Sequence, residues 1–236
     1  MGRGRRGTRR PARARVRRVT KRSRTVRLSD SATRAQTRTL AAHRRALVAQ
    51  LREEIGVPNV AAGRAALVML MGLPGVGKSH CARLLGARLG AAYVATDHLR
   101  SRLFIAASYA KEENAAVFGI AEALVDELLG EGHVVVLDAT NLTARDRGPA
   151  ESAARERGVP VFHVLVSADD GDTRARLEAR TRERAAGDHS DADVRVYERM
   201  RSRDFEPPAG GYLEIQNGAN VADDVARVAD LVRGRA

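Results

Sequence analysis

The sequence predicts an α/β protein built as a three-layer doubly wound parallel sheet. Short apolar runs alternate with helical patterns over most of the chain, and a glycine-rich loop joins the first run to the first of these helices. Strands buried on both faces appear as continuous apolar runs, and their alternation with helices implies parallel strands joined by right-handed crossovers. A length of 236 residues accommodates one such domain with an appendage.

Each element is assigned from its own pattern. Apolar β-type runs predict strands over residues 67–71, 92–96, 134–137, 161–166 and 212–215. Three-to-four-residue periodicity predicts helices over residues 78–89, 98–108, 114–130, 144–157, 171–186, 191–203 and 221–233. We therefore assign residues 66–236 to one domain, with a segment at about 171–203 that could act as a lid.

A separate helix is expected before this domain, within residues 28–56. Leu40, Leu47 and Leu51 recur at helical spacing, and Gly56 and Pro58 end the pattern. Its simplest purpose is structural, packing on the following domain. Residues 57–65 are expected to form a linker.

The formal net charge of +12 is concentrated in the first 27 residues, which carry twelve Arg, one Lys and no acid. The rest of the chain has 28 basic and 29 acidic residues. Such a segment cannot bury a core, so we expect residues 1–27 to be disordered. Three interpretations stay open: an extension without function, an arm that binds nucleic acid or another polyanion, and a transit peptide.

Cysteine content and hydropathy indicate a cytoplasmic protein without a membrane span. Cys81 is the single cysteine, so no internal disulfide can form. The longest uncharged run, 65–77, is far shorter than the roughly 20 apolar residues that cross a bilayer. Any metal chemistry must therefore use oxygen ligands.

The strongest motif is the phosphate-binding pattern G-x-x-x-x-G-K-[ST], which follows the first predicted strand and opens a helix. Its glycines let backbone N–H groups surround phosphate oxygens, Lys78 would reach the β- and γ-phosphates, and Ser79 would ligate Mg²⁺. The residues predicted to bind ATP are Gly72, Leu73, Pro74, Gly75, Val76, Gly77, Lys78 and Ser79.

Two carboxylates follow predicted strands, where ligands bind in open parallel sheets. Asp138 follows residues 134–137 and could hold Mg²⁺ beside Ser79, or it could cap a helix or turn. Asp97 follows residues 93–96 and could accept a hydroxyl proton as a general base, or it could cap the next helix.

Arginines in the second half of the chain offer charge for phosphoryl transfer. Arg176, Arg180 and Arg184 recur at i, i+4 and i+8, on one face of a predicted helix. They could form a solvated face paired with Glu178 and other acids, or part of a mobile lid that closes over the γ-phosphate. We favour the lid because Gly187 and a fresh cap pattern at 190–193 follow.

With these residues in place, the region from about 67 to 215 resembles the P-loop kinases that include the kinase domain of polynucleotide kinase and the zeta-toxin-like kinases. Such chains are often identified as AAA-type ATPases. The motifs that carry the resemblance are Gly72–Ser79, Thr96–Arg100, Leu137–Leu142, Arg176–Arg180, Ser190–Ala192 and Phe205–Pro208.

The resemblance implies ATP-dependent phosphorylation of a hydroxyl group, with ATP and Mg²⁺ as cofactors. It implies that Asp97 is the base, that Asp138 lies near Mg²⁺ and that Arg180 is the lid arginine. It also implies that the acceptor site is lined by Arg100, Asn141 and Arg145. Val76 departs from the small Ser or Ala that is frequent at its position.

The sequence therefore predicts a kinase acting on a small molecule or a nucleic-acid end, with an acceptor that no motif identifies. A polynucleotide 5′-hydroxyl kinase that uses the basic tail as its nucleic-acid arm is a special case. The alternative is a P-loop ATPase or nucleotide-dependent regulatory protein without a small-molecule acceptor.

Overall fold

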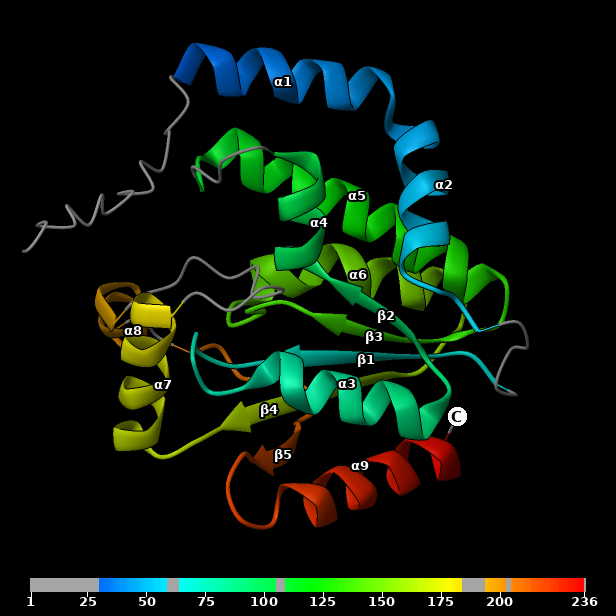
Figure 1. The fold of residues 1–236 in the computed structure, drawn as a ribbon. Helices are drawn as coiled ribbons and strands as arrows, with labels where there is room; N and C mark the ends of the chain where they lie inside the picture. Colours follow the sequence, from blue (N-terminus) through cyan, green and yellow to red (C-terminus); the bar gives the residue numbers. More distant parts are fainter. Residues whose placement is uncertain (1–29, 59–63, 105–108, 184–193, 203–204, 236) are drawn as a thin grey trace, which may run out of the picture.

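A computed structural model shows a five-stranded parallel sheet with helices on both faces (Figure 1). The structure describes residues 30–58, 64–104, 109–183, 194–202 and 205–235. The strand order is β2-β3-β1-β4-β5, so β1 is central, with β2 and β3 on one side of it and β4 and β5 on the other. The predicted three-layer doubly wound sheet is confirmed.

The strands form where the continuous apolar runs lie. Their bounds are β1 Ala66–Met71, β2 Ala92–Ala95, β3 Val134–Asp138, β4 Val161–Ser167 and β5 Leu213–Gln216. All residues of β1 and β3 are buried, as expected for central strands covered on both faces. Their carboxyl ends point towards the side of the molecule where α7 and α8 lie (Figure 1).

The helices lie close to the predicted ranges. Their bounds are α1 Asp30–Ala42, α2 Arg44–Glu54, α3 Lys78–Leu89, α4 Thr96–Leu103, α5 Lys111–Gly130, α6 Ala144–Glu156, α7 Asp170–Glu183, α8 Val194–Arg201 and α9 Val221–Arg235. Within the described part of the chain, no helix is both long and apolar enough to cross a membrane.

Two apolar cores fill the space between the layers. One lies between the sheet and α3 and α9, and includes Val68, Leu85 and Val228. The other lies between the sheet and α5 and α6, and includes Met69, Leu124 and Ala154. Alternate residues of β1 enter opposite cores because successive strand side chains point to opposite faces.

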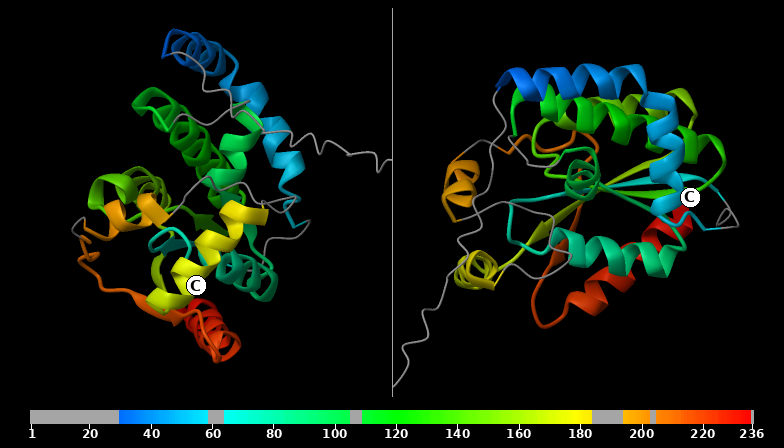
Figure 2. Two further views of the ribbon diagram at one scale, coloured as in Figure 1. Left: turned by 60° about the vertical axis from the view of Figure 1, so that its left-hand side comes forward. Right: turned by 45° about the horizontal axis from the view of Figure 1, so that its top comes forward.

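The N-terminal segment forms two helices where the sequence predicted one. The chain turns at His43 (φ −108°, ψ 15°), which precedes α2. This turn lets α1 lie along α5 while α2 runs down beside it (Figures 1 and 2). Val48 and Leu51 of α2 are each 2% exposed and join the α5 core, which explains why this segment folds onto the domain.

Hydrogen bonds and ion pairs also attach this segment to the domain. Gln36 donates to the Leu103 carbonyl at the end of α4 (2.9 Å). Arg102 of α4 binds Glu54 through two hydrogen bonds of 2.7 and 2.8 Å. The N-terminal helices therefore brace α4, whose first turn carries Asp97.

Several predicted features fall on other boundaries or outside the described residues. Thr96, predicted as the last residue of a strand, is the first residue of α4, and its hydroxyl donates to the Asp138 carbonyl (3.3 Å). Residues 1–27, part of the 57–65 linker, and the lid positions Arg184, Gly187 and 190–193 lie outside the described residues.

Candidate functional site

The loop Gly72–Gly77 joins β1 to α3 at the carboxyl edge of the sheet, and Lys78 is the first residue of α3. Gly75 (φ +82°) and Gly77 (φ +90°) have left-handed backbone conformations that side-chain-bearing residues rarely adopt. The loop thus needs glycine at these positions for its shape, and the N-terminus of α3 faces the same edge.

Two segments from the second half of the chain close around this loop. A Cβ on Gly75 would lie 2.7 Å from Cγ of Leu177 in α7, and Leu177 is fully buried. A Cβ on Gly77 would lie 1.9 Å from Nδ2 of Asn217, which donates to the Val76 carbonyl (2.8 Å). Asn217 was not predicted, because a single Asn between β5 and α9 gives only a turn signal.

Lys78 is the point on which the predicted charged residues converge. Its ammonium donates to the Leu73 carbonyl at 2.9 Å. Burial lowers the pKa of Lys78, while the negative charges of Asp138 and Asp97 act in the opposite direction and the positive charge of Arg180 adds to the lowering. Three other chain segments therefore bring their charges within electrostatic range of the Lys78 ammonium.

Asp138, the last residue of β3, is 5% exposed and accepts a hydrogen bond from the Tyr93 hydroxyl at 2.7 Å. Burial, followed by the charge of Asp138, raises the pKa of Tyr93 above its ordinary value, so the phenol keeps its proton at neutral pH. Asp138 does not cap α6, because the N-cap of that helix is Thr143.

This oxygen-donor set suits Mg²⁺, which prefers one or two carboxylate or hydroxyl ligands and keeps several waters. Among the described residues, no group of three or more His, Cys, Asp or Glu side chains could hold a metal by itself. Ser79 and Asp138 could hold Mg²⁺ together with the phosphates of a bound nucleotide, as the corresponding residues of P-loop proteins do.

Asp97 lies in the first turn of α4, whose N-cap position is Ala95. Because Ala95 occupies the N-cap position, Asp97 is not the N-cap that the structural alternative required. A carboxylate in the first turn is favoured by the helix dipole. Its role as a base stays a prediction.

Arg100, predicted to line the acceptor site, is held in a buried cluster. It forms an ion pair with the fully buried Glu113 (2.5 Å) and donates to Asn114 Oδ1 (2.9 Å). Its guanidinium carbon lies 4.5 Å from the ring centroid of Tyr109. These contacts give Arg100 a structural task between α4 and α5, and acceptor binding stays a prediction for it.

Asn141 is also buried. It has a left-handed backbone (φ +48°), and its side-chain Nδ2 donates to the Leu70 carbonyl at 2.8 Å. Its own carbonyl accepts from Arg147 (3.1 Å), a 2%-exposed residue of α6 that the sequence reasoning missed. Asn141 therefore supports the end of β1 through its bond to Leu70. Arg145, the third residue predicted to line the acceptor site, is exposed in the first turn of α6.

The motif Phe205–Pro208 lies against the same loop. Glu206 accepts from the Ala144 backbone N–H (2.8 Å), and its own N–H donates to the Leu142 carbonyl (3.0 Å). This carboxylate satisfies a free N–H at the start of α6. The loop that carries Asn141 is therefore held from both sides, by β1 and by residue 206.

Helix α7, which carries the partly buried Arg180, lies on the carboxyl side of the sheet (Figures 1 and 2). Three residues earlier on this helix, Leu177 touches the loop. Contacts to α8 tie the two helices together: Arg174 pairs with Glu198 (2.6 Å), and Asp170 pairs with Arg201 (2.6 Å) and Tyr197. Arg176 pairs with Asp172 (3.8 Å), as in the solvated-face interpretation.

Comparisons with known proteins agree with this fold. The family model AAA_33, described as an AAA domain, matches residues 67–208. An uncharacterised protein of Mycobacterium tuberculosis, Rv2004c, is 28% identical over 160 residues, a match that covers 63% of this chain and 31% of the relative. This chain thus spans about a third of the length of the curated relatives it matches.

Two solved structures illustrate the likeness. The APS kinase CysC of Mycobacterium tuberculosis, in complex with AMPPNP and APS, is 23% identical with a TM-score of 0.54, over 72% of this chain and 99% of its own. Kti12 of Chaetomium thermophilum, in complex with ADP-AlF3, is 23% identical with a TM-score of 0.57, over 71% of this chain and 97% of its own. The shared feature is a P-loop kinase-like fold.

Proposed function

Because this chain belongs to the AAA_33 family of AAA domains and has a P-loop kinase-like fold, we propose that it is an ATP-dependent phosphotransferase. It transfers the γ-phosphoryl group to a hydroxyl of a small molecule or a nucleic-acid end. The observation that supports this most is the convergence of Asp138, Asp97 and Arg180 on the ammonium of Lys78.

Each of these residues has a distinct task. ATP, when bound with Mg²⁺, supplies the phosphoryl group and a cation that neutralises phosphate charge. The loop N–H groups and Lys78 bind the phosphates, while Ser79 and Asp138 hold the cation. Lys78 now donates to the Leu73 carbonyl, so its ammonium exchanges that partner for phosphate oxygens.

Asp97 distinguishes transfer from simple nucleotide binding. A carboxylate within electrostatic range of the loop lysine can accept the proton of an acceptor hydroxyl as the oxygen attacks phosphorus. Arg180, on a helix that touches the loop through Leu177, adds positive charge where the phosphoryl oxygens gain negative charge. A simple ATPase has no need of a base for an alcohol acceptor.

The test is a screen with γ-labelled ATP against pools of nucleosides, oligonucleotide ends, sugars and aminoglycosides, with free phosphate measured in parallel. Wild-type protein should label one pool. Asp97→Asn should lose labelling by at least about 100-fold, as expected on removal of a general base, and keep its affinity for Mg·ATP.

Asp230→Asn provides a matched control, because Asp230 is an exposed aspartate on α9, in an ion pair with Arg233. It should behave as wild type. Phosphate release that needs no acceptor and is unchanged in Asp97→Asn would instead support the ATPase or regulatory alternative. Unchanged Mg·ATP affinity in Lys78→Ala would contradict the nucleotide site itself.

A further inference from the structure

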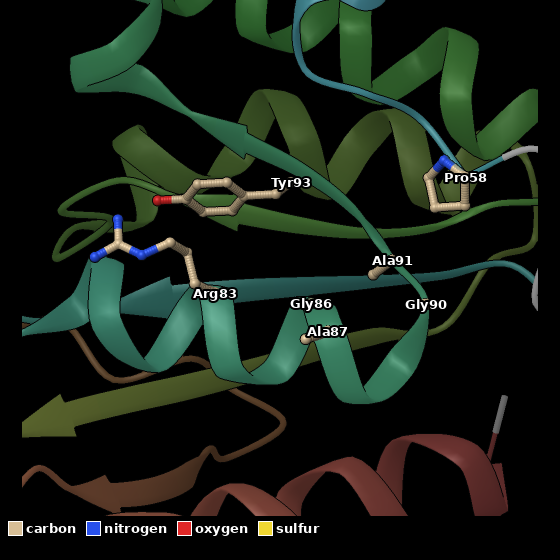
Figure 3. Close-up of a pocket in the computed structure, with 7 residues that line it drawn as sticks. All are labelled: Pro58, Arg83, Gly86, Ala87, Gly90, Ala91 and Tyr93. Carbon is tan, nitrogen blue, oxygen red and sulfur yellow. The ribbon is translucent and has the colours of Figure 1, made fainter. Parts of the chain in front are cut away.

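Tyr93 occupies a position between the sheet and α3 that the proposed transfer reaction does not explain. Its side chain packs with the core on the α3 side, whereas its neighbour Val94 enters the opposite core. The ring lines a pocket of about 310 Å³ with Pro58, Arg83, Gly86, Ala87, Gly90 and Ala91. Figure 3 shows the ring along this pocket, with its hydroxyl turned towards the carboxyl ends of the strands.

The strand register brings this hydroxyl to Asp138. Tyr93 pairs with Val136, and Ala95 pairs with Asp138, so Tyr93 and Asp138 are diagonal neighbours on adjacent strands. A long side chain can span such a diagonal. The result is the 2.7 Å hydrogen bond from the phenol to Asp138 Oδ2.

The direction of this hydrogen bond follows from the groups involved. An ionised carboxylate only accepts, so the single phenol proton is donated to Asp138. The Tyr93 hydroxyl therefore holds Oδ2 of Asp138 at a fixed place at the end of β3.

We infer that Tyr93 is a positioning residue for Mg²⁺: it orients the carboxylate of Asp138, the partner of Ser79 in the proposed cation site, before the cation arrives. This inference rests on the proposed function, which assigns Mg²⁺ to those two residues. Because the Tyr93 hydroxyl binds Oδ2 of Asp138, the other carboxylate oxygen, Oδ1, stays available to the hydration shell of the cation. The ring, packed against α3, keeps the hydroxyl in place.

Tyr93→Phe tests this role because it removes the hydroxyl and keeps the ring. Affinity for AMPPNP is measured by calorimetry in EDTA and in saturating Mg²⁺, and Mn²⁺ binding to the AMPPNP complex is measured by electron paramagnetic resonance. We expect the metal affinity to fall about 10- to 100-fold, as is usual for groups that orient metal ligands. AMPPNP affinity in EDTA and the melting temperature should stay close to wild type.

Tyr212→Phe is the matched control, since Tyr212 is 37% exposed and its ring packs edge-on against Phe205 (5.6 Å). It should not change metal affinity. Once an acceptor is known, excess Mg²⁺ should restore the rate of Tyr93→Phe, an effect that a purely structural defect would not show.

Asp138→Asn separates this inference from the proposed function. If Asp138→Asn loses metal binding and Tyr93→Phe does not, the role of Tyr93 is overturned and the proposed function stands. If neither variant loses metal binding, the cation is held elsewhere, and both the inference and the metal assignment of the proposed function fail.

Discussion

Leu177 of α7 packs directly over Gly75 of the phosphate-binding loop, so that a Cβ on Gly75 would lie 2.7 Å from Leu177 Cγ. The contact joins the predicted lid helix to the loop that it would cover. Substitution at either residue should therefore affect both nucleotide binding and the packing of α7 against the loop.

Gly75→Ala should weaken AMPPNP binding by at least about 10-fold, since a left-handed alanine costs about 1–2 kcal/mol and its methyl group collides with Leu177. Calorimetry gives the affinity. In a Leu177→Ala background the same substitution should cost less, because only the backbone strain remains. Equal costs in both backgrounds would show that the two residues are not coupled.

Lys78→Met should stabilise the nucleotide-free protein while abolishing phosphate binding. Burial lowers the pKa of Lys78 in the folded state, so the unfolded chain binds this proton more tightly, and the folded protein gains stability as pH rises towards the ordinary lysine value of about 10.4. Methionine removes the buried charge.

Urea unfolding at pH 7 measures this effect, with Lys111→Met as control because Lys111 is exposed at the start of α5. A lower free energy of unfolding for Lys78→Met than for wild type would contradict the expected cost of burying this ammonium.

Glu113→Gln should destabilise the protein by about 3–5 kcal/mol, the usual cost of leaving a buried charge without its partner. Arg100 and Glu113 are 6% and 0% exposed in their side chains, so water cannot replace the missing carboxylate. Chemical denaturation measures the loss. Glu112→Gln, one residue earlier and exposed, should change stability by less than about 0.5 kcal/mol.

The contact between α7 and α8 should weaken in acid. The hydrogen bond from Tyr197, with the charges of Arg201 and Arg174, lowers the pKa of Asp170 in the folded state. Its stabilising contribution is therefore complete above the unfolded value of about 3.9 and is lost as pH falls through the lower folded value. The stability difference between wild type and Asp170→Asn should be present at pH 7 and shrink below about pH 4, whereas a constant difference would exclude this linkage.

Leu51→Ala should destabilise the whole domain by about 2–5 kcal/mol, as removal of a buried leucine side chain usually does. Leu51 is 2% exposed and lies in the same core as α5 and β3. Thermal unfolding should show one cooperative transition at a lower temperature. Glu53→Ala, on an exposed position of α2, is the control, and a separate early transition in Leu51→Ala would mean that α2 folds independently.

Element order and the phosphate-binding loop could be predicted because their signals are local. Apolar runs, helical periodicity and the spacing from Gly72 to Ser79 involve residues that are neighbours in the chain. The turn at His43 was missed because the periodicity of α1 continues into α2, and only packing on α5 requires the chain to change direction there.

The sequence by itself thus determined the parallel sheet, the loop and the presence of carboxylates at strand ends. Only the tertiary structure decided which distant groups meet: Tyr93 with Asp138, Asn217 with Val76, and Arg100 with Glu113 rather than with solvent. The physical reason is strand order. Placing β3 beside β2 creates the diagonal contact of Tyr93 with Asp138, 45 residues apart in the chain. Placing β4 and β5 on the other side of β1 brings Asn217 to Val76, 141 residues away, and no local pattern encodes such contacts.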